Sequence, residues 1–551
     1  MTVKMKLGEI LLRVEEIEGL YPPALARSYL QGEPGVIRLF QYDPRRQEAF
    51  RDHLEYLLTQ RQEPLDLPAE CLKEYNLSLG CGSQTTANIE LIEKNRAVAV
   101  VTGQQPGFLT GPLYTIYKAM GTIVLARKLT RELGHPVVPV FWIGADDHDF
   151  AEVNHIYLPT SQGPQRVGLE EKPGVRFSLG HLPVPEEAGR LLDQIKELTP
   201  PMGWQQEGIE LLRKTARNSL NVADWFGRLM TFLFKDYGLV MVNPLLKPLR
   251  QRSAGLFYQA VMSAPRADQL LDSACREIRS LGFSPQVQSE GNKAHLFLYI
   301  QGQRQTLFAD KQTFYNREKR TTWEREQLAE QALTQPDSFS PDVVLRPVLQ
   351  NKLFPVLAYV AGPGEMGYFA QFKRIFELFN ERMPVIYPRP NVTLVEPLIH
   401  KLMQKYHVPL EQIPRGLEDF IAVYLEQSDE VGIAALFNEF NEMLKKHHKG
   451  LVKKVAIINP VIQGLGQDCL RRMTGNLRAF EAKVNQHHRR NHEAALRQLA
   501  KINHMLHPLG QWQERVYNVF PYLMKYGPDC IGEMISLMDV ENWQQKILFF
   551  D

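Results

Sequence analysis

The segment FWIGADDHDFAEVNH ends an apolar run in a cluster of ionisable side chains, Asp146, Asp147, His148 and Asp149. Carboxylates this close repel one another, so a cation, a ligand or solvent must offset the cost. Three interpretations are open: a metal site, the polar rim of a substrate pocket, or the solvated start of a helix capped by Asp146. Catalytic zinc normally takes three protein ligands at recognisable spacing, and we predict no metal site here. We expect a pocket rim in which Asp146 and Asn154 bind substrate, while Asp147, His148 and Asp149 are catalytic and His148 accepts a proton.

A glycine-rich turn precedes this cluster in the segment VVTGQQPGFLTGP, which leads from an apolar run into a helix. Helix N-termini present unpaired N–H groups, and glycine lets a ligand approach the main chain, so a phosphate or carboxylate would be stabilised there. The turn matches neither the P-loop nor the dinucleotide fingerprint, and a purely structural turn is the alternative. Its polar neighbours favour a binding site. We predict substrate contacts from Thr102, Gln104 and Gln105, and nucleotide contacts from Gly103, Gly107, Thr110, Gly111 and Lys118.

A second turn, Gly362-Pro363-Gly364-Glu365, also follows an apolar run. Glu365 falls at the third helical position, where its carboxylate can accept the N–H of the cap residue. This capping role and a binding role are equally open. Arg346, Arg389 and Lys118 are candidate anion partners near the ends of apolar elements. We expect nucleotide contacts from Gly362 and Gly364, and substrate contacts from Arg346, Glu365 and Tyr368.

Two strand–helix–strand units would hold these turns. In the first, PVVPVFWIGA is a buried strand that follows a long helix, which begins near Pro112 and ends near Gly134. In the second, strands at 355–361 and 383–387 flank a helix. Its apolar face consists of Phe369, Phe372, Phe376 and Phe379. With the segment GLVMVNP as a further strand, both units fit one doubly wound, mostly parallel sheet of the Rossmann type. Ligands bind such sheets beyond the carboxyl ends of the strands, where the turns and the Asp cluster fall.

The remaining sequence suggests three parts. We expect an α/β core over residues 1–393, in which 151–220 and 285–345 are turn-rich insertions. From 394 to 507 glycine and proline become sparse, and apolar stripes at helical spacing predict a long antiparallel helical arm that turns back near Asn459-Pro460. Residues 508–551 would return to the core. A stripe on so long a hairpin usually needs a partner, which favours a homodimer. The stripes consist of Ile433, Leu436, Phe440, Met443 and Leu444, and of Leu470, Met473, Leu477, Phe480 and Val484.

The composition of the chain indicates which partners and which cellular compartment to expect. The 551 residues are 44% hydrophobic and 23% charged, with 64 basic against 62 acidic side chains. This balance argues against nucleic acid and membrane surfaces as partners. The five cysteines form no CxxC pair, which favours a reducing compartment, and we find neither a signal peptide nor a membrane span. We therefore expect a cytoplasmic protein. His487, His488 and His492 lack a third ligand type nearby, so we place no site there.

Five blocks of sequence resemble one family: VVTGQQPGFLTGPLYTIYKA, DDHDFAEVNHI, SPDVVLRPVLQ, LAYVAGPGEMGYFAQ and GQWQERVYN. In this order they resemble the BshC family, cysteine ligases of bacillithiol biosynthesis, from about residue 95 onward. The resemblance implies a Rossmann-type core with connecting-peptide insertions and a coiled coil that forms a dimer. It also implies a reaction, in which cysteine is joined through an amide bond to the amino group of glucosaminyl-malate to give bacillithiol.

Amide formation from a free carboxylate is uphill in water, so we expect ATP with Mg²⁺ to activate the carboxylate, and no structural metal. Residues 97–118 look like the nucleotide-binding start of class I aminoacyl-tRNA synthetases. Leu109 to Pro112 stand where their paired-histidine motif would be, and no lysine-rich KMSKS-like loop is found. Two other hypotheses stay open: a nucleotide-binding scaffold for the true ligase, and a metal-dependent hydrolase that uses the Asp cluster.

Overall fold

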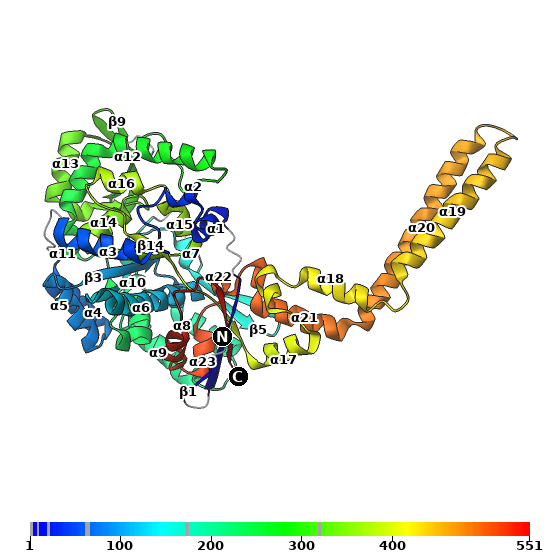
Figure 1. Cartoon of the computed structure of the whole chain (residues 1–551), viewed down its shortest axis with the longest axis horizontal. Coiled ribbons are helices and arrows are strands. Elements are labelled where there is room, and N and C mark those ends of the chain that lie inside the picture. The colour runs from blue at the N-terminus through cyan, green and yellow to red at the C-terminus, as the bar shows by residue number, and fades with distance from the viewer. Residues whose placement is uncertain are drawn as a thin grey trace. The chain divides into compact units, whose positions relative to one another are not determined.

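The computed structural model describes residues 4–7, 10–18, 23–60, 67–170, 176–317 and 321–550. Within them the chain divides into two compact units, one of residues 1–396 with 511–551 and the other Pro397–Gly510. Residues 171–175 and 318–320, which belong to the two predicted insertions, lie outside the described residues. Figure 1 shows both units.

The first unit is built on a five-stranded parallel sheet with the order β14-β13-β3-β4-β7. Its strands are β3 (Val98–Gln104), β4 (Val137–Ile143), β7 (Val240–Val242), β13 (Val356–Ala361) and β14 (Val385–Pro388). The order runs outward from β3 in one direction and then from β13 in the other, so the sheet is doubly wound. Both faces are covered, since Val140 and Trp142 pack in one core cluster while Phe141 packs in another. The predicted α/β fold is therefore confirmed.

The first βαβ unit follows its sequence closely. Helix α6 (Leu113–Leu133) begins after Pro112 and ends at Gly134, whose φ of 65° gives the left-handed cap that glycine adopts readily. Gly121 lies on the helix face toward Pro390. A Cβ there would fall 2.4 Å from the Pro390 ring, so only glycine allows this close approach.

The second βαβ unit, residues 355–387, departs from its prediction in one respect. The single helix expected after Gly362 is two short helices, α15 (Pro363–Phe369) and α16 (Lys373–Leu378). Gln371, buried between them, donates to the Val287 carbonyl at 2.7 Å and accepts the Val287 N–H at 2.9 Å. The break lets the Gln371 side chain pair with a neighbouring loop.

The two segments predicted as insertions contain sheets separate from the parallel sheet. The first contains the hairpin β5 (His155–Thr160) and β6 (Gly163–Gly168) with helices α8 (Ala188–Leu198) and α9 (Gln205–Arg217). The second contributes an antiparallel sheet of order β11-β10-β9-β8-β12. Its strands are β8 (Lys293–Ile300), β9 (Gln303–Asp310), β10 (Thr313–Asn316), β11 (Thr322–Glu324) and β12 (Phe339–Pro341). Helix α14 (Arg346–Leu353) returns the chain from this sheet to β13.

A further sheet joins segments from opposite ends of the sequence, in the order β1-β2-β16-β15. Its strands are β1 (Lys4–Leu7), β2 (Ile10–Ile17), β15 (Asn391–Val395) and β16 (Gln545–Phe550). The principal remaining helices of this unit are α1 (Ala24–Gln31), α3 (Gln47–Glu55), α4 (Ala69–Leu79), α5 (Ser83–Glu93), α7 (Phe150–Val153), α10 (Val222–Phe234), α11 (Lys247–Arg252), α12 (Ala254–Ser280), α13 (Arg325–Thr334), α22 (Gln513–Val516), α23 (Phe520–Tyr526) and α24 (Cys530–Leu537).

The second unit is helical, as predicted. Its main helices are α17 (Pro397–Tyr406), α18 (Glu418–Gln427), α19 (Ile433–Val455), α20 (Ile462–Asn491) and α21 (Glu493–Leu506). Helices α19 and α20 lie side by side as an antiparallel hairpin that turns at the expected Asn459, which accepts the N–H of Val461 at 3.0 Å (Figure 1). Phe437 on α19 contacts Phe480 on α20, with ring centroids 5.5 Å apart, although Phe480 is 59% exposed.

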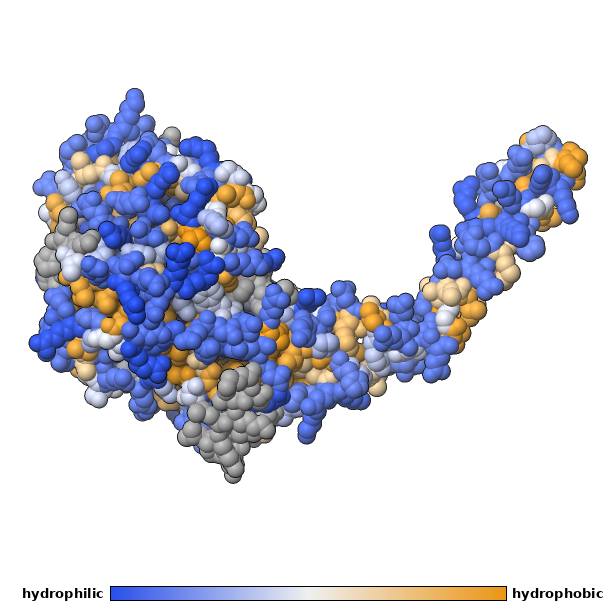
Figure 2. All heavy atoms as spheres, in the orientation of Figure 1, coloured by the Kyte–Doolittle hydropathy of each residue, from blue (hydrophilic) through white to orange (hydrophobic). Residues whose placement is uncertain are grey.

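The predicted stripe on α19 does not all face the partner helix. Ile433 is buried, whereas Leu436, Phe440 and Met443 are 51%, 53% and 47% exposed. Apolar residues also gather at the turn of the hairpin, where Figure 2 shows an apolar patch of Ile457, Ile458 and Val461. The hairpin thus carries more apolar surface than its own two helices cover.

Candidate functional site

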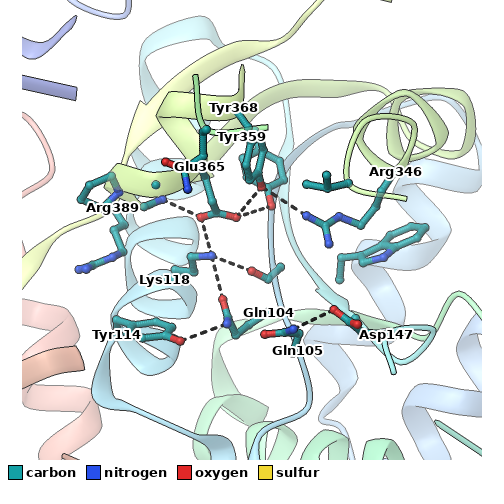
Figure 3. A pocket seen from close by; sticks show the side chains of 18 of the residues that line it. Gln104, Gln105, Tyr114, Lys118, Asp147, Arg346, Tyr359, Glu365, Tyr368 and Arg389 are labelled. Atoms are coloured by element: carbon teal, nitrogen blue, oxygen red, sulfur yellow. Dashed lines mark hydrogen bonds and ion pairs between the residues drawn. The ribbon is translucent and has the colours of Figure 1, made fainter. Parts of the chain in front are cut away.

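A cavity of about 360 Å³ opens at the carboxyl ends of β3 and β13. These two strands are neighbours at the point where the strand order reverses, which is where doubly wound sheets bind ligands. Residues from both glycine turns, α6, α14 and α22 line it (Figure 3). Its polar lining residues are Gln104, Gln105, Tyr114, Lys118, Asp147, Gln286, Arg346, Gln350, Tyr359, Glu365, Tyr368, Arg389 and Arg515.

Lys118 and Glu365 meet in the middle of this pocket, with Nζ 2.5 Å from Oε2 (Figure 3). Lys118 comes from α6 and also donates to the Gly103 carbonyl at 2.8 Å and to Gln104 Oε1 at 3.1 Å. Glu365 accepts the N–H of Gly362 at 2.7 Å and the hydroxyls of Tyr359 and Tyr368. Glu365 therefore has both expected roles: it caps α15 and belongs to the pocket.

Burial shifts the pKa values of Glu365 and Lys118, and their mutual attraction opposes these shifts. Burial opposes ionisation of Glu365, but the adjacent Lys118 ammonium and the Gly362 N–H bring its pKa below the ordinary value. Burial lowers the pKa of Lys118, and Glu365 opposes that shift. Burial and Glu365 raise the pKa of Tyr368, so its hydroxyl remains a hydrogen-bond donor. The two charges therefore compensate each other. Through Gly103 and Gly362 the ion pair links the two glycine turns at the point where the strand order reverses, which we call the switch point.

Arg346 and Gln350, one turn apart on α14, have hydrogen-bond donors that no described residue accepts. Arg346 donates to the Tyr368 hydroxyl at 3.3 Å, and among the described residues no carboxylate forms an ion pair with its guanidinium. Gln350 is 2% exposed, and its amide Nε2 is buried without a hydrogen-bond partner in the described structure. Buried donors without acceptors are rare because they are costly. Here they point to an acceptor supplied by a ligand.

Asp147 lines the floor of the pocket. Its Oδ2 accepts the Gln105 amide at 2.8 Å, and its Oδ1 accepts the N–H of His148 at 2.7 Å. Burial opposes ionisation of Asp147, but Arg304, with Nη1 3.9 Å from Oδ1, and the Gln105 amide lower its pKa below the ordinary value. Asp147 is therefore a carboxylate at neutral pH.

His148 lies beside the pocket and does not line it. Its ring packs against Phe297 at a centroid distance of 5.6 Å, and its Nδ1 is 3.3 Å from Arg304 Nη1. Burial, reinforced by Arg304, lowers the pKa of His148, so the imidazole is neutral at pH 7. Its nearest link to the cavity is Asp147, whose Oδ1 is 3.8 Å from Nδ1.

Other residues with predicted site roles lie outside the lining. Asp149 is exposed at the start of α7, and Asp146 is buried 3.7 Å from Arg250 Nη2. Asn154 donates to the Leu169 carbonyl at 2.9 Å. Thr102 donates to the Val360 carbonyl at 2.8 Å, which links β3 to β13. These contacts give Asp146, Asn154 and Thr102 structural partners, and the predicted site roles of all four residues stay predictions.

The first glycine turn divides into two parts. Gly103 lines the pocket, whereas Gly107, Thr110 and Gly111 lie in a buried loop outside it. Asn518 donates to the carbonyls of Leu109 and Gly111 at 2.7 and 2.6 Å, and the Leu113 N–H donates to the Tyr517 carbonyl at 2.8 Å. The start of α6 is thus tied to the segment near residue 518. In the second turn, both Gly362 and Gly364 line the pocket.

Several lining residues were not anticipated as site residues. Tyr114 is the second residue of α6, Gln286 lies in the second predicted insertion, and Arg515 lies in the segment GQWQERVYN. Arg389, considered only as an anion partner, pairs with Glu514 at 2.5 Å. Gln350 could have been found from its position four residues after Arg346, which places both on one helix face. Arg515 had no such local signal.

Some other possibilities receive no support within the described residues. No group of three His, Cys, Asp or Glu side chains there could hold a metal ion. No helix in the same residues is long and apolar enough to cross a membrane. The five cysteines all lie in the described part, and each is a free thiol.

Comparison with known proteins places the chain in a family. Residues 12–390 match the model of the bacillithiol biosynthesis BshC N-terminal Rossmann-like domain, and residues 392–550 match the BshC C-terminal coiled-coil domain. A relative from Desulforamulus reducens is 51% identical over 98% of this chain and all of its own length. Relatives from Symbiobacterium thermophilum and Geobacillus kaustophilus are 35% and 30% identical over the same shares. All three carry the name "Putative cysteine ligase BshC". With both domain models matched in order along almost its full length, the chain belongs to the BshC family.

Proposed function

We propose that this protein joins L-cysteine through an amide bond to the amino group of glucosaminyl-malate, forming bacillithiol in the pocket at the β3–β13 switch point. The observation that carries the proposal is the pair of unused donors on α14. A malyl group presents carboxylates, and a carboxylate accepts well from a guanidinium and an amide N–H one helical turn apart. Arg346 and Gln350 would therefore hold a malyl carboxylate.

The amino group of the sugar would lie toward Asp147, which is ionised and is held in place by the Gln105 amide at 2.8 Å. Asp147 would orient the amine, and we propose that the neutral imidazole of His148 takes up the released proton through Asp147. Asp149 remains a predicted third member, placed at the exposed end of the same segment.

We also propose that ATP with Mg²⁺ activates the cysteine carboxylate. The fit is partial. The lining includes Gly103, Lys118, Gly362 and Gly364, and among the described residues beyond its chain neighbours and its own helix backbone, no atom lies within 4 Å of where a Gly364 Cβ would be. Arg515 is exposed at the rim, and no carboxylate in the described chain pairs with it, so it would face phosphates. Mg²⁺ would be bound mainly by the phosphates and by water, as is common for this ion.

For assembly, we propose a homodimer formed through the exposed apolar faces of α19 and α20.

For location, we propose the cytoplasm, where the free thiols of all five cysteines would persist.

The test is mass spectrometry of the purified protein incubated with cysteine, glucosaminyl-malate and Mg²⁺, with and without ATP. The proposal expects bacillithiol only when ATP is present, together with AMP or ADP. Arg346→Lys should form less product at low glucosaminyl-malate concentration, because an ammonium lacks the forked geometry of a guanidinium. Absence of product under every condition would contradict the ligase activity. Product without ATP would contradict only the activation step.

A further inference from the structure

A buried charge cluster is linked to the start of α14 and lies outside the pocket lining. Its members are His295 on β8, Asp268 on α12 and Asp342 in the loop before α14, which are 1%, 1% and 6% exposed. His295 Nδ1 is 3.0 Å from Asp342 Oδ2, and His295 Nε2 is 3.4 Å from Asp268 Oδ1. An imidazole between two buried carboxylates is a costly arrangement unless the ring carries a positive charge.

Asp342 connects this cluster to the start of α14. Its Oδ1 accepts the N–H groups of Val344 and Leu345 at 2.8 and 3.4 Å, and its carbonyl accepts the N–H of Arg346 at 2.9 Å. Its own N–H donates to the His295 carbonyl at 3.0 Å. Asp342 is therefore held to His295 by main chain and side chain at once, and it fixes the turn from which Arg346 enters the pocket.

The charged groups around His295 determine the pH range in which its ring is protonated. Asp268 and Asp342 face the ring, and Lys293, from the same strand, lies 3.6 Å from Asp342 Oδ2 and 3.3 Å from Glu290. Burial opposes the imidazolium, yet the two aspartates raise the pKa of His295 to about 9. The ring is thus charged at neutral pH and loses its charge as the pH rises through about 9.

We propose that His295, with Asp342 and Asp268, positions the Arg346–Gln350 face of α14 for carboxylate binding. The inference rests on the proposed function, because it assumes that a malyl carboxylate binds there. Within the described residues, the hydrogen bonds and ion pairs of these three side chains reach no lining residue, so the cluster acts through Asp342 and the start of α14. His295 is consequently a positioning residue. Its loss should weaken carboxylate binding without removing any group that contacts the substrate.

The test measures binding of L-malate to the full-length protein by calorimetry between pH 7 and 10, a range in which both malate carboxylates stay ionised. The wild type should bind with constant affinity near pH 7 and lose affinity around pH 9. His295→Asn tolerates the φ of 57° at this position and can still donate to Asp342. It should bind about tenfold more weakly at pH 7, as is usual for residues along a coupling network, and show no further loss near pH 9.

Two further variants keep the result interpretable. Asp268→Asn leaves the shape of the cluster and removes one carboxylate, so the loss of affinity should move to lower pH. Asp224→Asn is the matched control, because Asp224 is a buried aspartate 3.3 Å from Arg228 and outside the pocket lining, and it should bind malate as the wild type does. Folded His295→Asn with wild-type affinity and pH dependence would overturn the inference alone. A wild type that binds no malate at pH 7 would overturn the carboxylate site of the proposed function and the inference with it.

Discussion

Gln350 is a single residue with opposite effects on stability and binding. Its buried Nε2 has no acceptor in the described chain, so the folded state bears the cost of a donor taken out of water. The same donor is available to a ligand. A side chain of similar size without the amide would remove both the cost and the contact.

We therefore predict that Gln350→Met raises the free energy of unfolding by about 1 kcal/mol and raises the KM for glucosaminyl-malate roughly tenfold. Urea unfolding and steady-state kinetics with cysteine saturating would measure the two effects. Gln286→Met is the control, because Gln286 is an exposed lining residue and should leave stability unchanged. A Gln350→Met protein that is less stable and has an unchanged KM would contradict the assigned role.

His295 should also make stability depend on pH. Its pKa is about 9 when folded against an ordinary value of 6.5, so folding favours the protonated ring. This contribution is complete below pH 6.5 and is lost as the pH rises through 9, and it amounts to on the order of 3 kcal/mol. Urea unfolding at pH 6.5 and 9.5 should show that fall in the wild type and a smaller fall in His295→Asn. Equal falls in both proteins would show that another group titrates instead.

At the level of elements, the sequence predicted what depends on local spacing. The strand VVPVFWI, the stop at Gly134 and the capping position of Glu365 follow from neighbours within a few residues. The break between α15 and α16 did not, because phenylalanines at the same spacing fit one helix or two. The break reflects the pairing of Gln371 with Val287, which lies in another part of the chain.

The site residues, too, were predictable where a local pattern marks them and not where a distant segment of the chain positions them. Glu365 was predicted because it lies in a glycine turn, and Lys118 because it is a basic residue near the end of an apolar element. The first glycine turn is held by hydrogen bonds from Asn518, which is 407 positions from Gly111 in the sequence. No local pattern reveals such a contact. The Asp cluster was only partly resolved for a related reason. Adjacent positions can point to different places, and only Asp147 of the cluster lines the pocket.

Packing of α6 gives a prediction at this scale. Gly121→Ala improves helix propensity by about 1 kcal/mol, yet the methyl group would overlap Pro390 at 2.4 Å. Overpacking of this kind costs about 1–3 kcal/mol, so we expect a net loss of unfolding free energy. Gly255→Ala, in α12, is the matched control, since no described atom outside its own helix backbone and chain neighbours lies within 4 Å of the added methyl group. The packing argument fails if both variants gain stability.

For the whole molecule, the exposed stripe on α19 predicts self-association. Leu436→Gln combined with Phe440→Gln should turn a dimer into a monomer at micromolar concentration, because it removes apolar area from the proposed interface. Sedimentation equilibrium would measure this change. Met262→Gln, on α12, replaces an apolar side chain that is 41% exposed and should leave the dimer intact. A monomeric wild type would refute the proposed interface.

The sheet β1-β2-β16-β15 has a consequence for how the protein is made. Strand β2 pairs with β16 through Ile17 and Gln545, which are more than five hundred positions apart. At ordinary rates of translation, β2 waits on the order of a minute before its partner emerges from the ribosome. During that interval one edge of β2 has no native partner, and an open strand edge is a place where chains pair wrongly. Nascent chains that stall before residue 545 should therefore be the ones that depend most on chaperones.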